Sequence, residues 1–170
     1  EIRESFDVLE LVGHIDTTLV TRMATAQENY VRTNALDQSI ETIRNRIANQ
    51  IRAPLPCLEM AQALHYDVGQ EFVLHCDFLD PQAMRDEIAR NGQRVATVII
   101  YLNEGFEGGQ TSFPRLGVNH RGKAGDALVF GNVDAAGNPD PRTQHAGCPP
   151  TRGEKWVFSQ WVRNQAPGGA

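Results

Sequence analysis

Residues 72–77 read FVLHCD, an apolar, strand-like run that ends in a histidine and an aspartate. We expect a strand over residues 70–78, in which successive side chains point to opposite faces of a sheet. His75 and Asp77 then share one face, and Cys76 points away from it. One imidazole and one carboxylate therefore lie two residues apart on a stiff support. On its own, such a pair is more often solvated or hydrogen-bonded than bound to a metal.

Two later residues extend this pair. His145 is expected on a short strand over residues 142–146, and Lys155 opens a strand over residues 155–163. Two histidines and one carboxylate are the ligand set of the facial triad in non-haem Fe(II) sites. The turn over residues 147–153 should fold the last strand back beside His145, which brings the ammonium near the metal to hold a carboxylate. Taken singly, His145 suits a loop and Lys155 a solvated strand start; their order and spacing together carry the signal.

A β-rich core is expected from Pro54 onward, because short apolar runs alternate there with Gly, Pro, Asn and Asp. This texture is typical of an all-β sandwich or barrel. The expected strands cover residues 62–67, 70–78, 94–102, 110–113, 126–131, 142–146 and 155–163. Residues 80–91 are predicted as a short helix with Pro81 at its first position.

The first 53 residues look helical and polar. One helix face is predicted from isoleucines at three- and four-residue spacing, namely Ile40, Ile43, Ile47 and Ile51. A second amphipathic helix fits the apolar residues Val8, Leu11, Val12, Ile15 and Leu19. Residues 27–36 are predicted as a loop. We expect a single domain over residues 1–170, in which a mostly helical support (1–53) carries a β core (54–170).

Composition narrows the function classes. The chain has 170 residues and a net charge of −5 from 16 basic and 21 acidic residues, which disfavours a nucleic-acid partner. No apolar run approaches the ~18 residues of a membrane span, so no membrane partner is expected. The three cysteines form neither a disulfide framework nor a zinc cluster, which favours a reducing, cytoplasmic location. No signal peptide opens the sequence, but Glu1 stands where a complete chain has Met, so a removed leader stays open.

At this point the sequence resembles the prolyl 4-hydroxylase-like family of Fe(II)/2-oxoglutarate dioxygenases, over about residues 63–162. The resemblance lies in the runs at 66–72 (YDVGQEF), 75–77 (HCD), 93–97 (QRVAT), 101–103 (YLN), 108–114 (GGQTSFP), 125–130 (GDALVF), 145–149 (HAGCP) and 153–156 (GEKW). It implies a mainly β, α+β fold: a distorted double-stranded β-helix of the jelly-roll type, with N-terminal helices packed on one sheet.

The resemblance also implies roles for eight residues. Iron would be held by His75, Asp77 and His145. The co-substrate 2-oxoglutarate would be bound through Lys155 on its distal carboxylate, with Tyr66 reaching the same group and Thr111 lining the pocket. Arg94 and Trp161 match positions near the substrate. Without the resemblance, Tyr66 and Thr111 suit core-edge packing, Trp161 the core, and Arg94 a solvated strand mouth.

The implied activity is hydroxylation of a prolyl residue in a peptide or protein, with O₂ consumed and 2-oxoglutarate converted to succinate and CO₂. Ascorbate is expected to be at most supportive. Phe72 stands where collagen-type members often carry tyrosine, which argues against collagen-like repeats as substrate. Residues 27–36 and 80–91 are candidate substrate clamps. Alternatives are a hydroxylase of a free amino acid or another small molecule, an oxidative nucleic-acid demethylase, and a catalytically silent metal-binding jelly roll.

Overall fold

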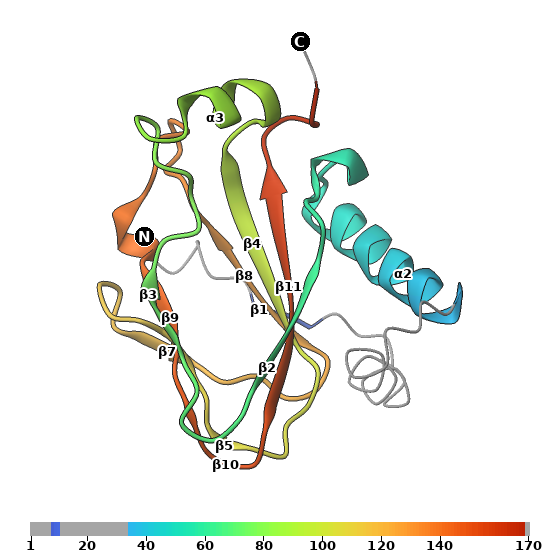
Figure 1. Cartoon of the computed structure of the whole chain (residues 1–170), viewed down its shortest axis with the longest axis vertical. Coiled ribbons are helices and arrows are strands. Elements are labelled where there is room, and N and C mark those ends of the chain that lie inside the picture. Colours follow the sequence, from blue (N-terminus) through green and yellow to red (C-terminus); the bar gives the residue numbers. More distant parts are fainter. Residues whose placement is uncertain (1–7, 11–33, 169–170) are drawn as a thin grey trace.

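The computed structural model describes residues 8–10 and 34–168 of the chain (Figure 1). The strands are β1 (Val8–Glu10), β2 (Gln62–Tyr66), β3 (Phe72–His75), β4 (Arg94–Tyr101), β5 (Glu107–Gly108), β6 (Thr111–Phe113), β7 (Val118–His120), β8 (Asp126–Gly131), β9 (His145–Gly147), β10 (Pro150–Arg152) and β11 (Lys155–Arg163). The helices are α2 (Asn34–Ile51), α3 (Arg85–Asn91) and the 3₁₀ turns η2 (Leu55–Cys57) and η3 (Pro141–Thr143).

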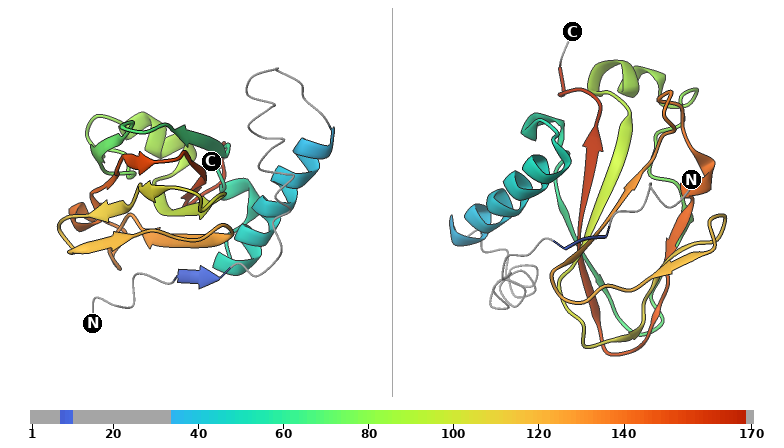
Figure 2. Two further views of the ribbon diagram at one scale, coloured as in Figure 1. Left: turned by 90° about the horizontal axis from the view of Figure 1, so that it is seen from below. Right: turned by 180° about the vertical axis from the view of Figure 1, so that it is seen from behind.

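Two antiparallel sheets form the body of the molecule. The larger has the strand order β1-β8-β4-β11-β2 and the smaller the order β3-β9-β6-β7. The short pair β10-β5 lies at one end, where the chain passes from one sheet to the other, and α3 lies at the opposite end (Figures 1 and 2). Two facing sheets of this kind are the layers of a jelly roll.

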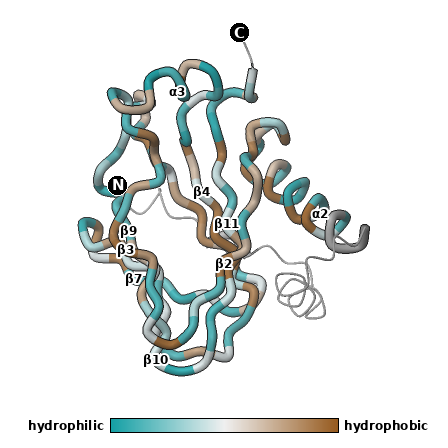
Figure 3. The backbone as a smooth tube through the Cα atoms, in the orientation of Figure 1, coloured by the Kyte–Doolittle hydropathy of each residue, from teal (hydrophilic) through white to brown (hydrophobic). Residues whose placement is uncertain are grey.

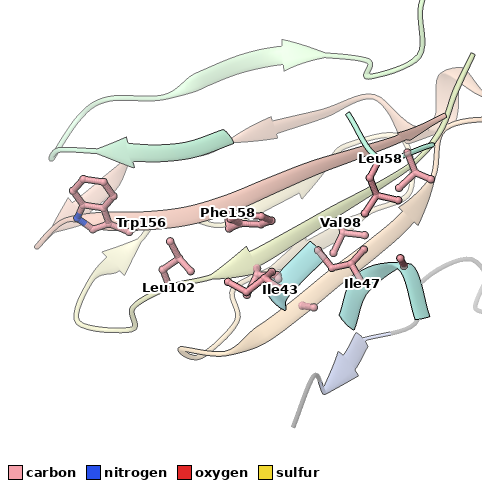
Figure 4. Packing of buried hydrophobic residues seen from close by; sticks show 11 residues of the cluster. Ile43, Ile47, Leu58, Val98, Leu102, Trp156 and Phe158 are labelled. Carbon is pink, nitrogen blue, oxygen red and sulfur yellow. The ribbon is translucent and has the colours of Figure 1, made fainter. Parts of the chain in front are cut away.

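The period-2 alternation of β4 builds a core on each face of the large sheet. Val98 and Ile100 point to the face that α2 covers. There they pack in one cluster with Ile43 and Ile47 of the helix and with Phe158 of β11 (Figure 4). Colouring by hydropathy shows the apolar runs gathered in the central strands of this sheet and on one side of α2 (Figure 3). The isoleucine face predicted for the helix is therefore the face that is buried, at roughly 1.5–3 kcal/mol of stabilisation per fully buried side chain.

A second core fills part of the space between the two sheets. Tyr101 of β4 and Phe130 of β8 meet Phe113 of β6 there, and all three side chains are almost fully buried. Phe113 and Phe130 pack edge to face with their ring centroids 5.0 Å apart. The remainder of that space is a cavity, so the same alternation that packs α2 on one face also lines the cavity on the other.

Several predicted boundaries are wrong. The strand predicted over 70–78 ends at His75, and the one predicted over 142–146 is replaced by η3 followed by β9. The helix predicted over 80–91 begins only at Arg85, because the Asp80 carboxylate accepts hydrogen bonds from the amides of Gln82 and Ala83 and holds a turn. Strands β5, β7 and β10 were not predicted, since two or three residues are too few to show a period.

The N-terminal predictions are partly corrected. Val8 lies in a strand and not in a helix, because Val8–Glu10 pairs with the otherwise free edge of β8. Leu11, Val12, Ile15 and Leu19 lie outside the described residues. The loop predicted over 27–36 overlaps α2, which begins at Asn34, and residues 27–33 are likewise outside the description. No helix in the described part of the chain combines the length and apolar character needed to cross a membrane.

Candidate active site

The cavity between the sheets collects alternate residues of β11. Lys155, Val157, Ser159 and Trp161 all line it, while their neighbours Trp156 and Phe158 point into the core under α2. The opposite wall comes from the small sheet and the segment that follows β3. Strand β11 pairs with β2 and β4, and β9 pairs with β3 and β6. The prediction that β11 folds back beside His145 is therefore wrong in detail: the two strands belong to facing sheets, and only their side chains meet across the cavity.

Three predicted ligands converge on this cavity. His75 Nε2 lies 3.3 Å from Asp77 Oδ1, and His145 Nε2 lies 3.7 Å from Asp77 Oδ2. One donor atom from each residue lies within 4.8 Å of the other two. His75 ends β3, His145 opens β9 directly opposite it in register, and Asp77 sits in the bend after β3. The three side chains thus offer two imidazole nitrogens and one carboxylate to a common point.

Both imidazoles are oriented by backbone carbonyls. His75 Nδ1 lies 2.7 Å from the carbonyl of Val73, and His145 Nδ1 lies 3.0 Å from the carbonyl of Thr143. A carbonyl can only accept, so each Nδ1 carries the proton and donates. The lone pair of a neutral ring is then on Nε2, the atom that faces Asp77, as metal-ligating histidines require. This hydrogen-bond pattern fits a divalent transition metal.

The carboxylate of Asp77 is buried and is itself held in place. Thr97 Oγ1 donates to Asp77 Oδ2 at 2.7 Å, and Asn132 Nδ2 donates to that hydroxyl at 2.9 Å. Burial alone would raise the pKa of Asp77, but the neighbouring imidazoles of His75 and His145 and the hydrogen bond from Thr97 hold it below its usual range. Asp77 is therefore an anion at neutral pH, although only 4% of it is exposed.

His145 is as buried as Asp77, whereas His75 is partly exposed. The rings of Phe113 and Phe130 lie 5.2 and 4.8 Å from its ring centroid. Burial lowers the pKa of His145, against the opposing attraction of Asp77. The imidazole is consequently neutral at physiological pH and available as a ligand.

Lys155 occupies the end of the cavity at which β2 ends in Tyr66. It is 2% exposed and stands opposite Tyr66 in the β11–β2 register, with its ammonium 5.0 Å from the Tyr66 ring centroid. Burial lowers the pKa of Lys155 to about 8. No carboxylate of the described residues lies within ion-pair distance of it. A buried, unpaired cation of this kind calls for an anionic ligand.

Two phenols stand beside that ammonium. Burial, with a smaller effect of Tyr101, raises the pKa of Tyr66 to about 12, so its hydroxyl remains a hydrogen-bond donor. The Tyr101 hydroxyl lies 3.0 Å from Thr111 Oγ1 and donates to the carbonyl of His120 at 3.1 Å. Thr111 is thereby fixed on the cavity wall, where the sequence placed it. Lys155, Tyr66 and Thr111 form one polar end of the pocket.

The far end of the cavity is walled by Trp161. In the β11–β4 register Trp161 stands opposite Thr97, the residue that holds Asp77, whereas Lys155 is six residues away along β11. Arg94 does not line the cavity. Its guanidinium carbon lies 3.7 Å from the centroid of the Trp161 ring, and its Nε and Nη2 donate to Glu59 at 2.7 and 2.9 Å. The solvated strand mouth expected for Arg94 is replaced by a half-buried ion pair.

A second group of metal-type side chains lies on the other face of β2. His65 Nε2 is 2.8 Å from Glu154 Oε2 and 3.7 Å from Asp67 Oδ1. His65 also stacks on Trp156, with ring centroids 4.2 Å apart. Asp67 and Glu154 are exposed, and the group faces solvent.

Seven of the eight predicted residues line one cavity, and Arg94 touches it through Trp161. Sequence reasoning missed Thr97, Tyr101 and Glu59, which hold other site residues. Thr97 and Tyr101 alternate along β4 with Val98 and Ile100, which pack under α2, so the sequence pattern predicts that both face the other side of the sheet. The pattern does not predict the side chains that they contact there. Nothing local in the sequence distinguishes Glu59 from a solvated glutamate.

Comparison with known families gives a match over residues 61–163 to the 2OG-Fe(II) oxygenase superfamily. A protein from Acanthamoeba polyphaga mimivirus named putative prolyl 4-hydroxylase is 36% identical over 129 residues, which cover 74% of this chain and 53% of that protein. Prolyl 4-hydroxylase 1 of Arabidopsis thaliana is 34% identical over 140 residues, 75% of this chain and 48% of the relative. The chain spans about half the length of the curated relatives it matches.

Solved structures show the same fold. The viral collagen prolyl hydroxylase of Paramecium Bursaria Chlorella virus-1, in its 2OG complex, superposes with a TM-score of 0.68 over 94% of this chain and 95% of that chain, at 23% identity. A prolyl-4-hydroxylase from Pseudomonas putida gives a TM-score of 0.59 at 21% identity, covering 95% of this chain and 86% of that one. The predicted double-stranded β-helix is confirmed, and of the N-terminal helices predicted to pack on one sheet, the described residues contain α2.

Proposed function

Because the chain belongs to the 2OG-Fe(II) oxygenase superfamily, we propose that it is an Fe(II)- and 2-oxoglutarate-dependent dioxygenase that hydroxylates a prolyl residue in a peptide or protein. One observation carries the proposal: the His75–Asp77–His145 group, in which Asp77 and His145 are buried, shares one cavity with a buried Lys155 that has no carboxylate partner among the described residues. The names of the curated relatives support the prolyl substrate. Residues 1–170 are proposed to act as a single domain, and cytoplasmic localisation remains a prediction.

The iron would be held by His75 and His145 through Nε2 and by Asp77 through its carboxylate. When bound, Fe(II) supplies the redox chemistry that couples conversion of 2-oxoglutarate and O₂ into succinate and CO₂ to oxidation of a substrate C–H bond. The chain contributes ligand geometry: the carbonyls of Val73 and Thr143 fix the two rings, and Thr97 fixes the carboxylate.

Lys155 would bind the distal carboxylate of 2-oxoglutarate. An incoming anion favours the charged ammonium, so binding raises the lysine pKa from about 8 and keeps the proton on Nζ. The Tyr66 hydroxyl, protonated at neutral pH, is placed to donate to the same group. The co-substrate then lies between Lys155 and the metal ligands, and the apolar walls exclude water around it.

The substrate would approach from the Trp161 end, since Lys155 takes the other. The face of an indole suits a proline ring. Arg94 uses Nε and Nη2 on Glu59, which leaves its Nη1 without a hydrogen bond to any described residue and free to donate to a peptide carbonyl. These features suit an extended, uncharged peptide better than a polyanion.

The test compares a proline peptide with the same peptide carrying alanine in place of proline. Succinate release and a mass gain of one oxygen atom in the proline peptide alone are the expected results. Asp77→Asn should abolish both, while Lys123→Ala, at an exposed lysine, should leave both unchanged. Oxidation of a free amino acid or a methylated base with no oxidation of any proline peptide would contradict the substrate proposal.

A further inference from the structure

We propose that Glu59 is a positioning residue for the substrate end of the cavity: its carboxylate holds the Arg94 guanidinium flat over the indole of Trp161. Oε1 of Glu59 accepts from Arg94 Nε at 2.7 Å and from Arg163 Nε at 2.6 Å, and Oε2 accepts from Arg94 Nη2 at 2.9 Å. Paired N–H donors on one carboxylate fix the plane of a guanidinium as well as its position. The guanidinium held in this way lies over the indole, with its carbon 3.7 Å from the ring centroid.

The backbone of Glu59 is anchored from several elements. Its amide donates to the carbonyl of Trp161 at 3.0 Å, so the two residues are joined directly. Its own carbonyl accepts from Gln160 Nε2 at 2.7 Å and from Arg44 of α2. Leu58, the residue before it, forms a bridge to Val162 of β11. The carboxylate is therefore presented from a rigid point beside the strand that carries the indole.

Trp161 has no comparable anchor of its own. Its Nε1 is buried and meets no acceptor among the residues that the structure describes. The orientation of its ring is thus set by packing, in which the Arg94 guanidinium lies over one ring face. If Arg94 moved away, nothing polar in the described chain would hold the indole at the cavity wall.

Arg94 depends on Glu59 for its only carboxylate partner among the described residues, whereas Arg163 has further partners. Arg163 also donates from Nη2 to Glu87 at 2.9 Å and from Nη1 to the carbonyl of Gly92 at 2.7 Å. Arg94 has no other carboxylate partner within the described residues. Neutralising Glu59 therefore leaves the Arg94 guanidinium without an anionic partner among the described residues. Neutralising Glu87 leaves Arg163 its hydrogen bonds to Glu59 and to the carbonyl of Gly92.

The first readout needs neither metal nor substrate. The chain has two tryptophans, so a Trp156→Phe background leaves Trp161 as the sole indole reporter. In that background Glu59→Gln should increase the quenching of Trp161 fluorescence by iodide and shift the emission maximum, because the guanidinium no longer covers the ring. Glu87→Gln, an identical change of charge in the same network, should leave the quenching as it was.

A cycle with Arg94→Gln separates positioning from general damage. If Glu59 acts through Arg94, the Arg94→Gln variant shows the same increase in quenching and adding Glu59→Gln changes nothing further. Unchanged quenching in Arg94→Gln overturns the proposal, even if Glu59→Gln should fail to fold. Equal effects of Glu59→Gln and Glu87→Gln overturn it as well.

The second readout rests on the proposed function. In the native background Glu59→Gln should raise KM for a proline peptide about fivefold with little change in kcat, as loss of a contact that positions a binding group predicts. A fall in kcat with KM unchanged would contradict the assignment. If the native chain oxidises no proline peptide, the proposed function fails while the fluorescence result still decides the role of Glu59.

Discussion

Two groups of histidines and carboxylates lie on opposite faces of the same part of the fold. His75, Asp77 and His145 lie inside the cavity, and His65, Asp67 and Glu154 lie outside it; in each group the candidate ligand atoms fall within 4.8 Å of one another. Donor type and spacing therefore do not distinguish them. Two chain neighbours make the contrast sharp, because Glu154 belongs to the outer group and Lys155 to the cavity.

The groups differ in what surrounds the donors. Asp77 is 4% exposed, whereas the side chains of Asp67 and Glu154 are 67% and 58% exposed. Both cavity histidines donate Nδ1 to a backbone carbonyl, but His65 Nδ1 makes no hydrogen bond to a described residue, and its Nε2 is already engaged by Glu154. Oriented imidazoles and a buried carboxylate favour a metal centre, and of these two groups the one in the cavity has both.

The largest expected effect is on metal affinity. Asp77→Asn should weaken binding of Fe(II) or of Mn(II) as a surrogate by more than about 100-fold, since loss of a ligand exceeds the ~10–100-fold cost of losing an outer partner. Glu154→Gln should leave affinity and a stoichiometry of one unchanged. Calorimetric titration measures both, and a second equivalent of metal that disappears with Glu154→Gln would break the comparison.

The next effect concerns the co-substrate. Lys155→Ala removes a charge-assisted hydrogen bond of ~1.5–3 kcal/mol and should weaken 2-oxoglutarate binding by roughly tenfold to more than a hundredfold. Metal affinity should change little. Lys123→Ala, at the only other lysine of the chain, is the matched control. A dissociation constant for 2-oxoglutarate that is the same in both variants would assign the anchor to another residue.

A smaller effect tests the partner that holds Asp77. Thr97→Val keeps the shape of the side chain but removes the hydroxyl that donates to the carboxylate, and should weaken metal binding about tenfold. Thr151→Val, at an exposed threonine on β10, makes the same chemical change away from the ligands. Equal metal affinity in the two variants would show that burial alone, without the donated hydrogen bond, separates the two groups.

The smallest effect is a pH dependence. Because burial lowers the pKa of Lys155 to about 8, raising the pH from 7 to 9 removes most of its positive charge, and 2-oxoglutarate affinity should fall up to about tenfold. Titrations of the metal-loaded chain across this range measure it, with Lys155→Ala as the variant in which the slope disappears. An affinity that rises with pH would contradict the assignment.

The same shift has a stability counterpart with a definite sign. Lys155 has a lower pKa in the folded chain than its ordinary value, so the unfolded chain binds more protons above about pH 8. Its burial therefore costs stability at neutral pH, and this cost shrinks as the pH rises from about 8 toward the ordinary lysine value. Thermal melts of the co-substrate-free chain should show Lys155→Met to be more stable than the native chain near pH 7.

Local patterns in the sequence were enough to predict a candidate ligand set and the facing of the central strands. The set His75, Asp77, His145 and Lys155 was recognisable because the order and spacing of these residue types can be read along the chain. Strands 126–131 and 155–163 were predicted with their observed limits, and the isoleucine face of α2 is the buried face. Hydrophobic periodicity and secondary-structure propensity are local properties of the chain. These features can therefore be predicted without knowing which segments pack together.

Which segments meet depends on the folded arrangement and could not be read from local patterns. That β9 and β11 lie in facing sheets, that Asp77 sits in a bend beyond β3, and that Glu59 and not solvent holds Arg94 all depend on strand register between distant segments. The environment that lowers the pKa of Lys155 has the same origin, since burial is a property of what packs around a residue and not of the residue. Local patterns specify which face a side chain takes; the pairing of strands far apart in the chain specifies what it faces.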